Sequence, residues 1–174
     1  GVSGYEFRFS NEIADIFAKY CDEVKTDALG NVIGIKKTVL SNGKSVMIEA
    51  HTDEIGLMIT DIDDRGFMHF AAVGGIDARI LPAKQVVIHG KKDIKGVIGA
   101  KPPHITTSEE RNKAVPMKDL YIDTGYNADE LKEIVSVGDT VTFDAKFYEL
   151  GKKYISTNSQ DDRTGVAVLV MVMN

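Results

Sequence analysis

The feature that most constrains the fold is a change in the predicted secondary structure in the middle of the chain. Residues 62–153 consist of short β-rich runs separated by glycine pairs, other turn residues and Pro102-Pro103, whereas the flanking segments mix helical and strand patterns. Short strands at regular spacing are typical of a small barrel or sandwich. The runs are residues 67–73, 85–89, 95–98 and 140–143. We therefore expect an α/β domain interrupted by an inserted β domain.

The segment before the insertion predicts a helix, a turn and two strands. Ser10 is the expected N-cap of the helix, whose apolar face recurs at a spacing of three and four residues. That face comprises Ile13, Ile16, Phe17, Tyr20 and Cys21. A turn at residues 27–31 (DALGN) precedes a strand through Val32 and Ile35, and Ser41-Asn42-Gly43 signals a hairpin. The apolar run inside residues 45–50 then suits a strand buried on both faces.

Three other segments complete the organisation. A short helix capped by Asn127 is expected inside the insertion, with Leu131, Ile134 and Val135 as its apolar face. The charged run at residues 108–113 is most simply a solvated loop. After the insertion, Asp161-Asp162-Arg163 leads into an apolar helix over residues 164–173.

Composition argues against nucleic-acid binding, internal disulfides and membrane association. The 174 residues carry 21 Lys and Arg against 26 Asp and Glu, a net charge of −5, which disfavours a surface that binds nucleic acid. A single cysteine, Cys21, permits no internal disulfide and favours a reduced, cytoplasmic setting. Cys21 lies on the apolar helix face, so we expect it to pack rather than react. The longest apolar run, residues 165–173, is shorter than the roughly 18 residues of a membrane span, and no membrane association is expected.

His51 and Asp53 form the first candidate site. They follow the apolar strand predicted for residues 45–50 and, being two residues apart, they face the same side. Ligand sites in open α/β sheets lie at the carboxyl ends of strands. A histidine there can bind a metal while a carboxylate orients its ring. A surface turn with two solvated polar residues is the alternative interpretation.

Asp161 and Asp162 form the second candidate site. Adjacent carboxylates before an apolar helix are most simply an N-terminal cap. The alternative is that one of them bridges two metal ions about 3.5–4 Å apart, as in aminopeptidase-type sites. The long separation from His51 in sequence is no obstacle, because an inserted domain would be looped out.

The remaining polar residues give weaker signals. His69 and His89 lie in β runs and His104 lies in a loop, and none has a carboxylate two residues away. The sequence contains neither a nucleophile elbow nor a phosphate-binding loop, so serine hydrolysis and P-loop chemistry have no motif support. Glu109-Glu110 lies in the charged loop rather than after an apolar strand, and we reject it as a general base.

Several ordered motifs resemble the tetrahedral aminopeptidases, metallopeptidase family forty-two, whose members are also labelled glutamyl aminopeptidase, deblocking aminopeptidase or endoglucanase. The resemblance covers essentially the whole chain. Its motifs are residues 1–6 (GVSGYE), 27–31 (DALGN), 50–56 (AHTDEIG), 74–77 (GGID), 101–104 (KPPH), 121–125 (YIDTG) and 161–165 (DDRTG). Residues 157–160 depart from the family's usual Lys-Ala-hydrophobic sequence, which affects local substrate contacts more than the fold.

The resemblance implies a fold and a set of site residues. The fold is a partial zinc-peptidase-like αβα catalytic domain, over residues 1–62 and 154–174, with a β-barrel dimerisation domain inserted at residues 63–153. His51 would ligate one metal ion and Asp161 would bridge two, with Zn or Co as the expected ions. Asp53 would be the catalytic carboxylate behind His51. In such sites the peptide bond after the bridging Asp is commonly cis.

Family members are about twice as long as this chain, and their second half supplies a Glu pair, an Asp and a His. The resemblance thus implies that the intact protein is a cytoplasmic, binuclear metal-dependent aminopeptidase acting on short peptides, whose dimers assemble into a hollow dodecamer. One alternative is that the chain itself is an inactive fragment with a self-associating β domain. Another is endoglucanase activity, for which the sequence identifies no pair of flanking carboxyl groups.

Overall fold

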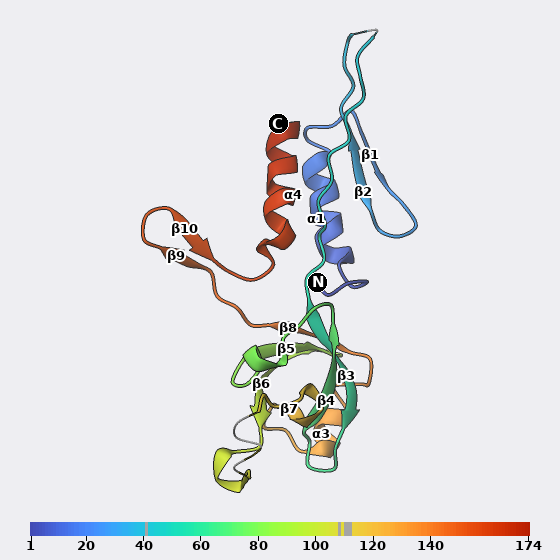
Figure 1. Ribbon diagram of the computed structural model, residues 1–174. Coiled ribbons are helices and arrows are strands. Elements are labelled where there is room, and N and C mark those ends of the chain that lie inside the picture. The colour runs from blue at the N-terminus through green and yellow to red at the C-terminus, as the bar shows by residue number, and fades with distance from the viewer. Residues whose placement is uncertain (41, 108, 110–112) are drawn as a thin grey trace. The chain divides into compact units, whose positions relative to one another are not determined.

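The computed structural model describes residues 1–40, 42–107, 109 and 113–174 (Figure 1). The chain divides into two compact units. One contains Gly1 with residues 3–54 and 159–174, and the other contains Val2 with residues 55–158. The predicted domain boundaries, at residues 62/63 and 153/154, both lie within the second unit.

The first unit begins with helix α1 (Phe7–Phe17), which starts earlier than predicted. Ser10 is not its N-cap, because the Ser10 amide donates to the Glu6 carbonyl at 2.9 Å and so already belongs to the helical ladder. Ile13 and Phe17 of the predicted apolar face are buried. Cys21 lies beyond the helix and packs beside the small core that these residues form with Val166.

A β-hairpin follows, as the sequence predicts. Strands β1 (Glu23–Thr26) and β2 (Val32–Ile35) pair antiparallel. Between them, Asp27 Oδ1 accepts hydrogen bonds from the amides of Leu29 and Asn31, each at 2.9 Å. This Asx-type bonding fixes the turn in the predicted DALGN segment.

The strand predicted for residues 45–50 is wrong. The segment has no regular secondary structure, and Val46 and Met47 are 81% and 85% exposed. A strand buried on both faces needs neighbours that pair with its backbone and cover its side chains, and no strand in the described residues pairs with this segment. The hairpin predicted at Ser41-Asn42-Gly43 includes Ser41, which is outside the described residues.

The first unit ends with helix α4 (Gln160–Met173). Asp161 and Asp162 have non-helical backbone angles, so the regular helix starts after them, in agreement with the predicted range of 164–173. Val166 is buried in the small core, and Figure 1 shows α1 and α4 running side by side.

The second unit is built on a closed barrel of antiparallel strands. Around the barrel the order is β3-β4-β7-β6-β5-β8. The strands are β3 (Gly56–Ile62), β4 (Met68–Val73), β5 (Gln85–His89), β6 (Asp93–Ala100), β7 (Leu120–Asp123) and β8 (Thr140–Phe143). The predicted small β architecture is therefore confirmed as a barrel.

The barrel core follows from alternation along the strands. In β6, Ile94, Gly96 and Ile98 are buried while their neighbours are exposed or half-buried, the period of two expected of a strand with one face inside. Helix α3 (Ala128–Lys132) starts with a complete capping box between Asn127 and Glu130. It contributes Leu131 to the same core as the barrel strands.

The remaining elements are short. Within the described residues, the 3-10 helices η1 (Ala78–Ile80), η2 (Pro103–Ile105) and η3 (Met117–Asp119) connect the strands. Strands β9 (Tyr148–Leu150) and β10 (Tyr154–Ser156) form a separate hairpin with exposed side chains. In the part of the chain that is described, no helix is both long and apolar enough to cross a membrane.

Candidate metal centre

His51, Asp53 and Asp161 meet within the first unit. The Nδ1 atom of His51 lies 3.0 Å from Oδ1 of Asp53, and its Nε2 atom lies 3.1 Å from Oδ1 of Asp161. Asp53 also accepts a hydrogen bond from the hydroxyl of Ser3. The structure thus brings together all three residues that the sequence singles out, although 110 positions separate His51 from Asp161.

Both ring nitrogens of His51 face carboxylate oxygens, which constrains what occupies the site. An ionised carboxylate only accepts hydrogen bonds, and a neutral imidazole has a single N–H to donate. If the Nδ1 proton is donated to Asp53, then Nε2 and Asp161 Oδ1 present lone pairs to each other. That arrangement is stable only with a proton or a cation between the two atoms.

The electrostatics of His51 and Asp53 agree with a shared proton or cation at this site. Desolvation alone would lower the pKa of His51, but the hydrogen bond to Asp161 and the charge of Asp53 outweigh it and raise that pKa. The pKa of Asp53 is lowered, chiefly by the hydrogen bond from the Ser3 hydroxyl; desolvation is the next largest contribution and opposes it, and the charge and hydrogen bond of His51 lower the pKa further. Asp53 is therefore ionised near neutral pH and favours the His51 tautomer that carries the proton on Nδ1.

The backbone at the start of α4 presents Asp161 to the histidine. The Asp161–Asp162 peptide bond is cis. The Asp162 Oδ1 atom accepts a hydrogen bond from the Gly165 amide at 2.9 Å, so Asp162 caps the regular helix. The Asp161 side chain is 96% exposed. The two carboxylates therefore differ in their contacts: Asp162 caps the helix, as the simple interpretation predicts, and Asp161 faces His51.

His51 Nε2 and Asp161 Oδ1 fit two ligands of one divalent ion. Ligand atoms about 2.1 Å from a tetrahedral zinc ion are about 3.4 Å apart, and the observed separation is 3.1 Å. Imidazole and carboxylate are also common zinc ligands. In the described residues, however, no group of three or more His, Cys, Asp or Glu side chains is placed to hold an ion. The described residues thus bring two possible ligand atoms together without completing a metal site.

The other candidates from the sequence lie elsewhere or make different contacts. His89 belongs to the barrel, where its ring contacts Asp93 and Thr142, each at 2.9 Å. His104 is exposed in η2. The rejected Glu109-Glu110 pair includes Glu110, which lies outside the described residues.

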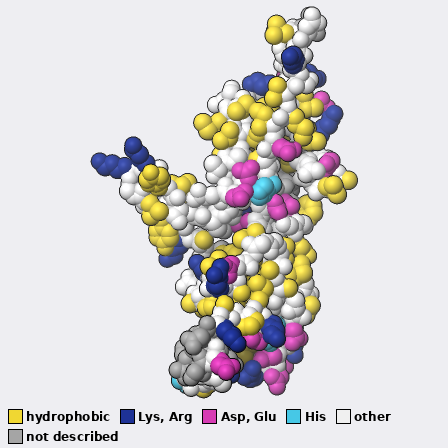
Figure 2. Space-filling view, in the orientation of Figure 1, with side chains coloured by type: hydrophobic (Ala, Val, Ile, Leu, Met, Phe, Trp, Pro, Cys, Tyr) yellow, Lys and Arg dark blue, Asp and Glu magenta, His cyan; other side chains and the backbone are white. Residues whose placement is uncertain are grey.

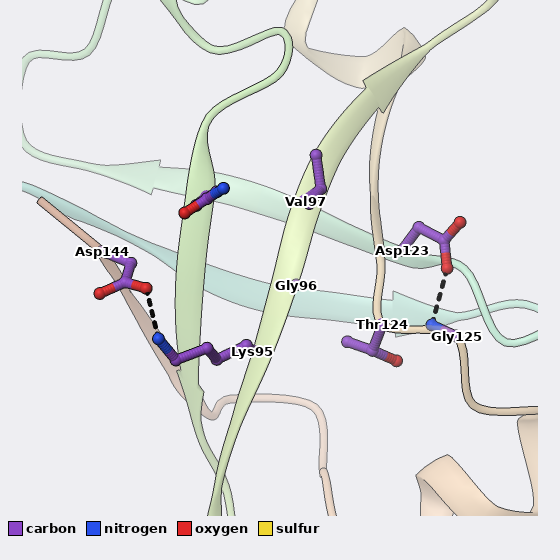
Figure 3. Close-up of a pocket in the computed structure, with 8 residues that line it drawn as sticks. Lys95, Gly96, Val97, Asp123, Thr124, Gly125 and Asp144 are labelled. Atoms are coloured by element: carbon purple, nitrogen blue, oxygen red, sulfur yellow. Dashed lines mark hydrogen bonds and ion pairs between the residues drawn. The ribbon is translucent and has the colours of Figure 1, made fainter.

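A hollow of about 470 Å³ lies on the barrel, apart from these residues (Figure 3). Its charged side chains are already engaged. Lys95 pairs with Asp144 at 2.8 Å, and Asp123 accepts a hydrogen bond from the Gly125 amide at 2.8 Å. Among the described residues that line it there is no histidine or cysteine, so it lacks the imidazole and thiolate groups that commonly bind zinc.

Sequence reasoning missed the residues that surround the three central ones. Ser3, Glu54, Ser159 and Arg163 all contact the cluster or the segment that carries Asp161. Ser3, Glu54 and Arg163 lie in motifs that resemble the family, but only their contacts in the folded chain reveal a shared role. Figure 2 shows a histidine with acidic side chains beside it on an open face of the molecule.

Comparison with known proteins shows which family the chain belongs to. Residues 30–174 match the model of the M42 glutamyl aminopeptidase family. The chain is 32% identical over 168 residues to the lysyl aminopeptidase of Pyrococcus furiosus, a match that covers 94% of this chain and 48% of that protein. The chain spans about half the length of the curated relatives it matches.

Solved structures share the fold. Aminopeptidase APDkam598 from Desulfurococcus kamchatkensis has a TM-score of 0.91 and 36% identity, covering 99% of this chain and 48% of its own. The TET1 peptidase of Pyrococcus horikoshii, described as assembling into a tetrahedron or an octahedral shell, has a TM-score of 0.84 and 39% identity, covering 99% and 52%. A Thermotoga maritima protein labelled endoglucanase has a TM-score of 0.82 and 37% identity, covering 99% and 50%. The chain belongs to the M42 glutamyl aminopeptidase family.

Proposed function

We propose that the complete protein carrying this chain is a metal-dependent aminopeptidase that releases N-terminal residues from short peptides. The observation that carries the proposal is the meeting of His51 Nε2 and Asp161 Oδ1 at 3.1 Å, with Asp53 on the other ring nitrogen. Membership in this family of peptidases supports the reaction class. The chain supplies part of the site and is by itself inactive in this proposal.

His51 and Asp161 are the metal-binding residues of the proposal. Two ions, Zn²⁺ or Co²⁺, would be bound: His51 would hold one of them through Nε2, and the Asp161 carboxylate would contribute to holding both. Such ions polarise a peptide carbonyl and activate water. Asp53 accepts a hydrogen bond from the Nδ1–H group of His51. This bond keeps the ring oriented and the Nε2 lone pair available. Ser3 donates to Asp53 and holds this carboxylate in turn.

The proposal extends to the surroundings of the site. The barrel unit would act as the inserted domain expected over residues 63–153, and through it the protein would form a homo-oligomer. The assembly described for the Pyrococcus horikoshii neighbour supports this part. We also propose a cytoplasmic location, because the lone Cys21 leaves the chain without an internal disulfide.

The direct test is hydrolysis of short peptides by the complete protein. Wild type should release N-terminal amino acids, a chelator should abolish release, and Zn²⁺ or Co²⁺ should restore it. His51→Ala should lose nearly all activity, and Asp53→Asn should lose about 10–100-fold, as expected for a carboxylate that orients a metal ligand. His104→Ala, an exposed histidine in η2, is the matched control. Undiminished activity in His51→Ala would refute the site assignment.

Glycoside hydrolysis is the rival reaction, because a structural neighbour is labelled endoglucanase. It requires two carboxyl groups flanking a glycosidic bond. Asp53 and Asp161 instead lie on either side of one imidazole ring and both contact it. Cellulose included as a second substrate in the same assay separates the two reactions, and we expect release from peptide only.

A further inference from the structure

Glu54 carries a partly buried carboxylate next to the candidate metal centre. Its side chain is only 11% exposed, although Asp53 before it reaches the open site. The Oε1 atom lies 3.6 Å from Nη2 of Arg163, and Oε2 accepts a hydrogen bond from the Ser159 hydroxyl. A carboxylate withdrawn from water requires such partners.

Two of the partners of Glu54 flank Asp161 in sequence. Ser159 comes two residues before Asp161 and Arg163 two residues after it, and the Arg163 amide donates to the Ser159 carbonyl at 3.2 Å. Ser159 has a φ of 60°, in the left-handed region that a residue with a side chain rarely adopts. Surrounding contacts must hold such a residue in place, and the bond to Glu54 is one of them.

Arg163 is fixed from a second direction. Its guanidinium lies over the ring of Phe9 in α1, 4.4 Å from the ring centroid. A cation over an aromatic face is attracted by the ring quadrupole, more strongly when water is excluded. The segment 159–163 is thus attached at both ends, whereas the Asp161 side chain between them is almost fully exposed. The position of Asp161 depends on its backbone rather than on packing of its own side chain.

We propose that Glu54 is a positioning residue, which holds Ser159 and Arg163 so that Asp161 faces His51 at metal-ligand distance. The inference rests on the proposed function, since it assigns Asp161 to a metal. Glu54 does not act on substrate in this scheme, because its carboxylate is engaged by Ser159 and Arg163. It acts through the backbone that carries Asp161.

The test measures metal affinity and activity in the complete protein. Zn²⁺ alone is the probe, in competition with a chromophoric chelator, at a temperature well below the unfolding transition of every variant. Glu54→Ala should weaken Zn²⁺ binding by about 10–100-fold, the range for residues that orient a metal ligand. Glu54→Gln keeps an acceptor for Ser159 but loses its charge toward Arg163, so its loss should be smaller. The kcat for a short peptide should fall while KM stays near the wild-type value.

The matched control is Glu12→Gln, which removes an exposed carboxylate in α1 that pairs with Arg8 at 3.6 Å. It should leave Zn²⁺ affinity unchanged. If Glu54→Ala does not fold, Arg163→Met tests the same connection from the other partner and should also weaken Zn²⁺ binding. Wild-type Zn²⁺ affinity in a folded Glu54→Ala, or in Arg163→Met where that variant is used instead, would overturn the inference.

His51→Ala distinguishes this inference from the proposed function. If wild type binds no Zn²⁺, or if His51→Ala binds it as tightly as wild type, the metal-site assignment fails and the inference fails with it. If His51→Ala loses Zn²⁺ but Glu54→Ala keeps it, the proposed function stands and the positioning role of Glu54 is refuted. Loss in both variants, with Glu12→Gln unchanged, supports both.

Discussion

At the scale of single residues, Gly165 shows how tightly the start of α4 is built. A Cβ atom added at Gly165 would lie 2.5 Å from both carboxylate oxygens of Asp162. The same carboxylate accepts a hydrogen bond from the backbone N–H of Gly165. A side chain at position 165 must therefore displace the Asp162 cap, which explains a glycine at a helical position where alanine is ordinarily favoured.

Gly165→Ala should thus destabilise the first unit, by about 1–2 kcal/mol, the cost of losing an N-cap. Denaturant unfolding followed by circular dichroism measures this change. Gly75→Ala is the matched control, because a Cβ there meets no atom within 4 Å. Helix propensity alone predicts a gain of about 1 kcal/mol for Gly165→Ala, so a stabilised variant would contradict the steric argument.

Asp77 provides a residue-scale test of electrostatics in the barrel unit. Hydrogen bonds from the side chain and amide of Arg79 lower the pKa of Asp77 from 3.8 to about 2. Because the folded pKa lies below the unfolded one, this group contributes stability above pH 3.8 and loses it as the pH falls through about 2. The contribution comes from the charged form that caps η1.

An NMR titration of the Asp77 carboxyl carbon should therefore give a midpoint near pH 2 in the folded protein. In Arg79→Gln the midpoint should move up toward 3.8, because the guanidinium donors are removed. Lys84→Gln, at an exposed position in the same unit, should leave it unchanged. A wild-type midpoint near 3.8 would show that the Asp77–Arg79 pair does not persist in solution.

At the scale of elements, the short helix α3 depends on its cap. It has only five residues, yet Leu131 is fully buried in the barrel core. Isolated helices of this length are unstable, so the capping box at Asn127 and tertiary packing must hold it. The Oδ1 atom of Asn127 accepts a hydrogen bond from the backbone N–H of Glu130, with a distance of 3.0 Å between the oxygen and the nitrogen.

Asn127→Ala should reduce the free energy of unfolding of the barrel unit by about 1 kcal/mol, the usual cost of a lost N-cap. Chemical denaturation gives this value directly. Glu133→Ala, at the exposed end of the same helix, should change it by less than about 0.5 kcal/mol. Equal effects of the two substitutions would mean that the capping box contributes nothing measurable.

The same elements show what the sequence can and cannot predict. The Asn127 cap, the turn begun by Asp27 and the limits of β5 rest on local chemistry, and the structure has them as predicted. The predicted strand at residues 45–50 rests on the apolar character of the segment and on the hairpin signal before it. A strand also needs pairing neighbours, and these are properties of the whole sheet rather than of the segment.

The candidate site also contains residues that the sequence predicts and residues that it does not. His51, Asp53 and Asp161 were selected from residue type, spacing and a family resemblance, and the structure brings the three together. Glu54 gave no signal of its own, because its partners Ser159 and Arg163 lie more than 100 residues away. Contacts between segments that are distant in sequence follow from the fold, and no local sequence pattern predicts them.

At the scale of the whole molecule, the two units have cores of very different extent. The barrel core runs through all six strands and α3, with Leu57, Ile88 and Leu131 fully buried. The core of the first unit centres on Ile13, Phe17 and Val166. Apolar side chains also lie exposed on this unit, among them Val46, Met47 and Met171 of α4. Because burial of apolar surface is the main source of stability, the units should differ in stability.

Heating the 174-residue chain should therefore give two transitions, with the first unit unfolding before the barrel. Hydrogen exchange should show slow amides in β3–β8 and fast ones at residues 45–50, which have no strand partner in the described structure. Two core truncations assign the transitions. Ile13→Ala should lower only the first midpoint and Leu131→Ala only the second, each costing about 2–5 kcal/mol. A single transition that both variants shift equally would show that the two units unfold as one.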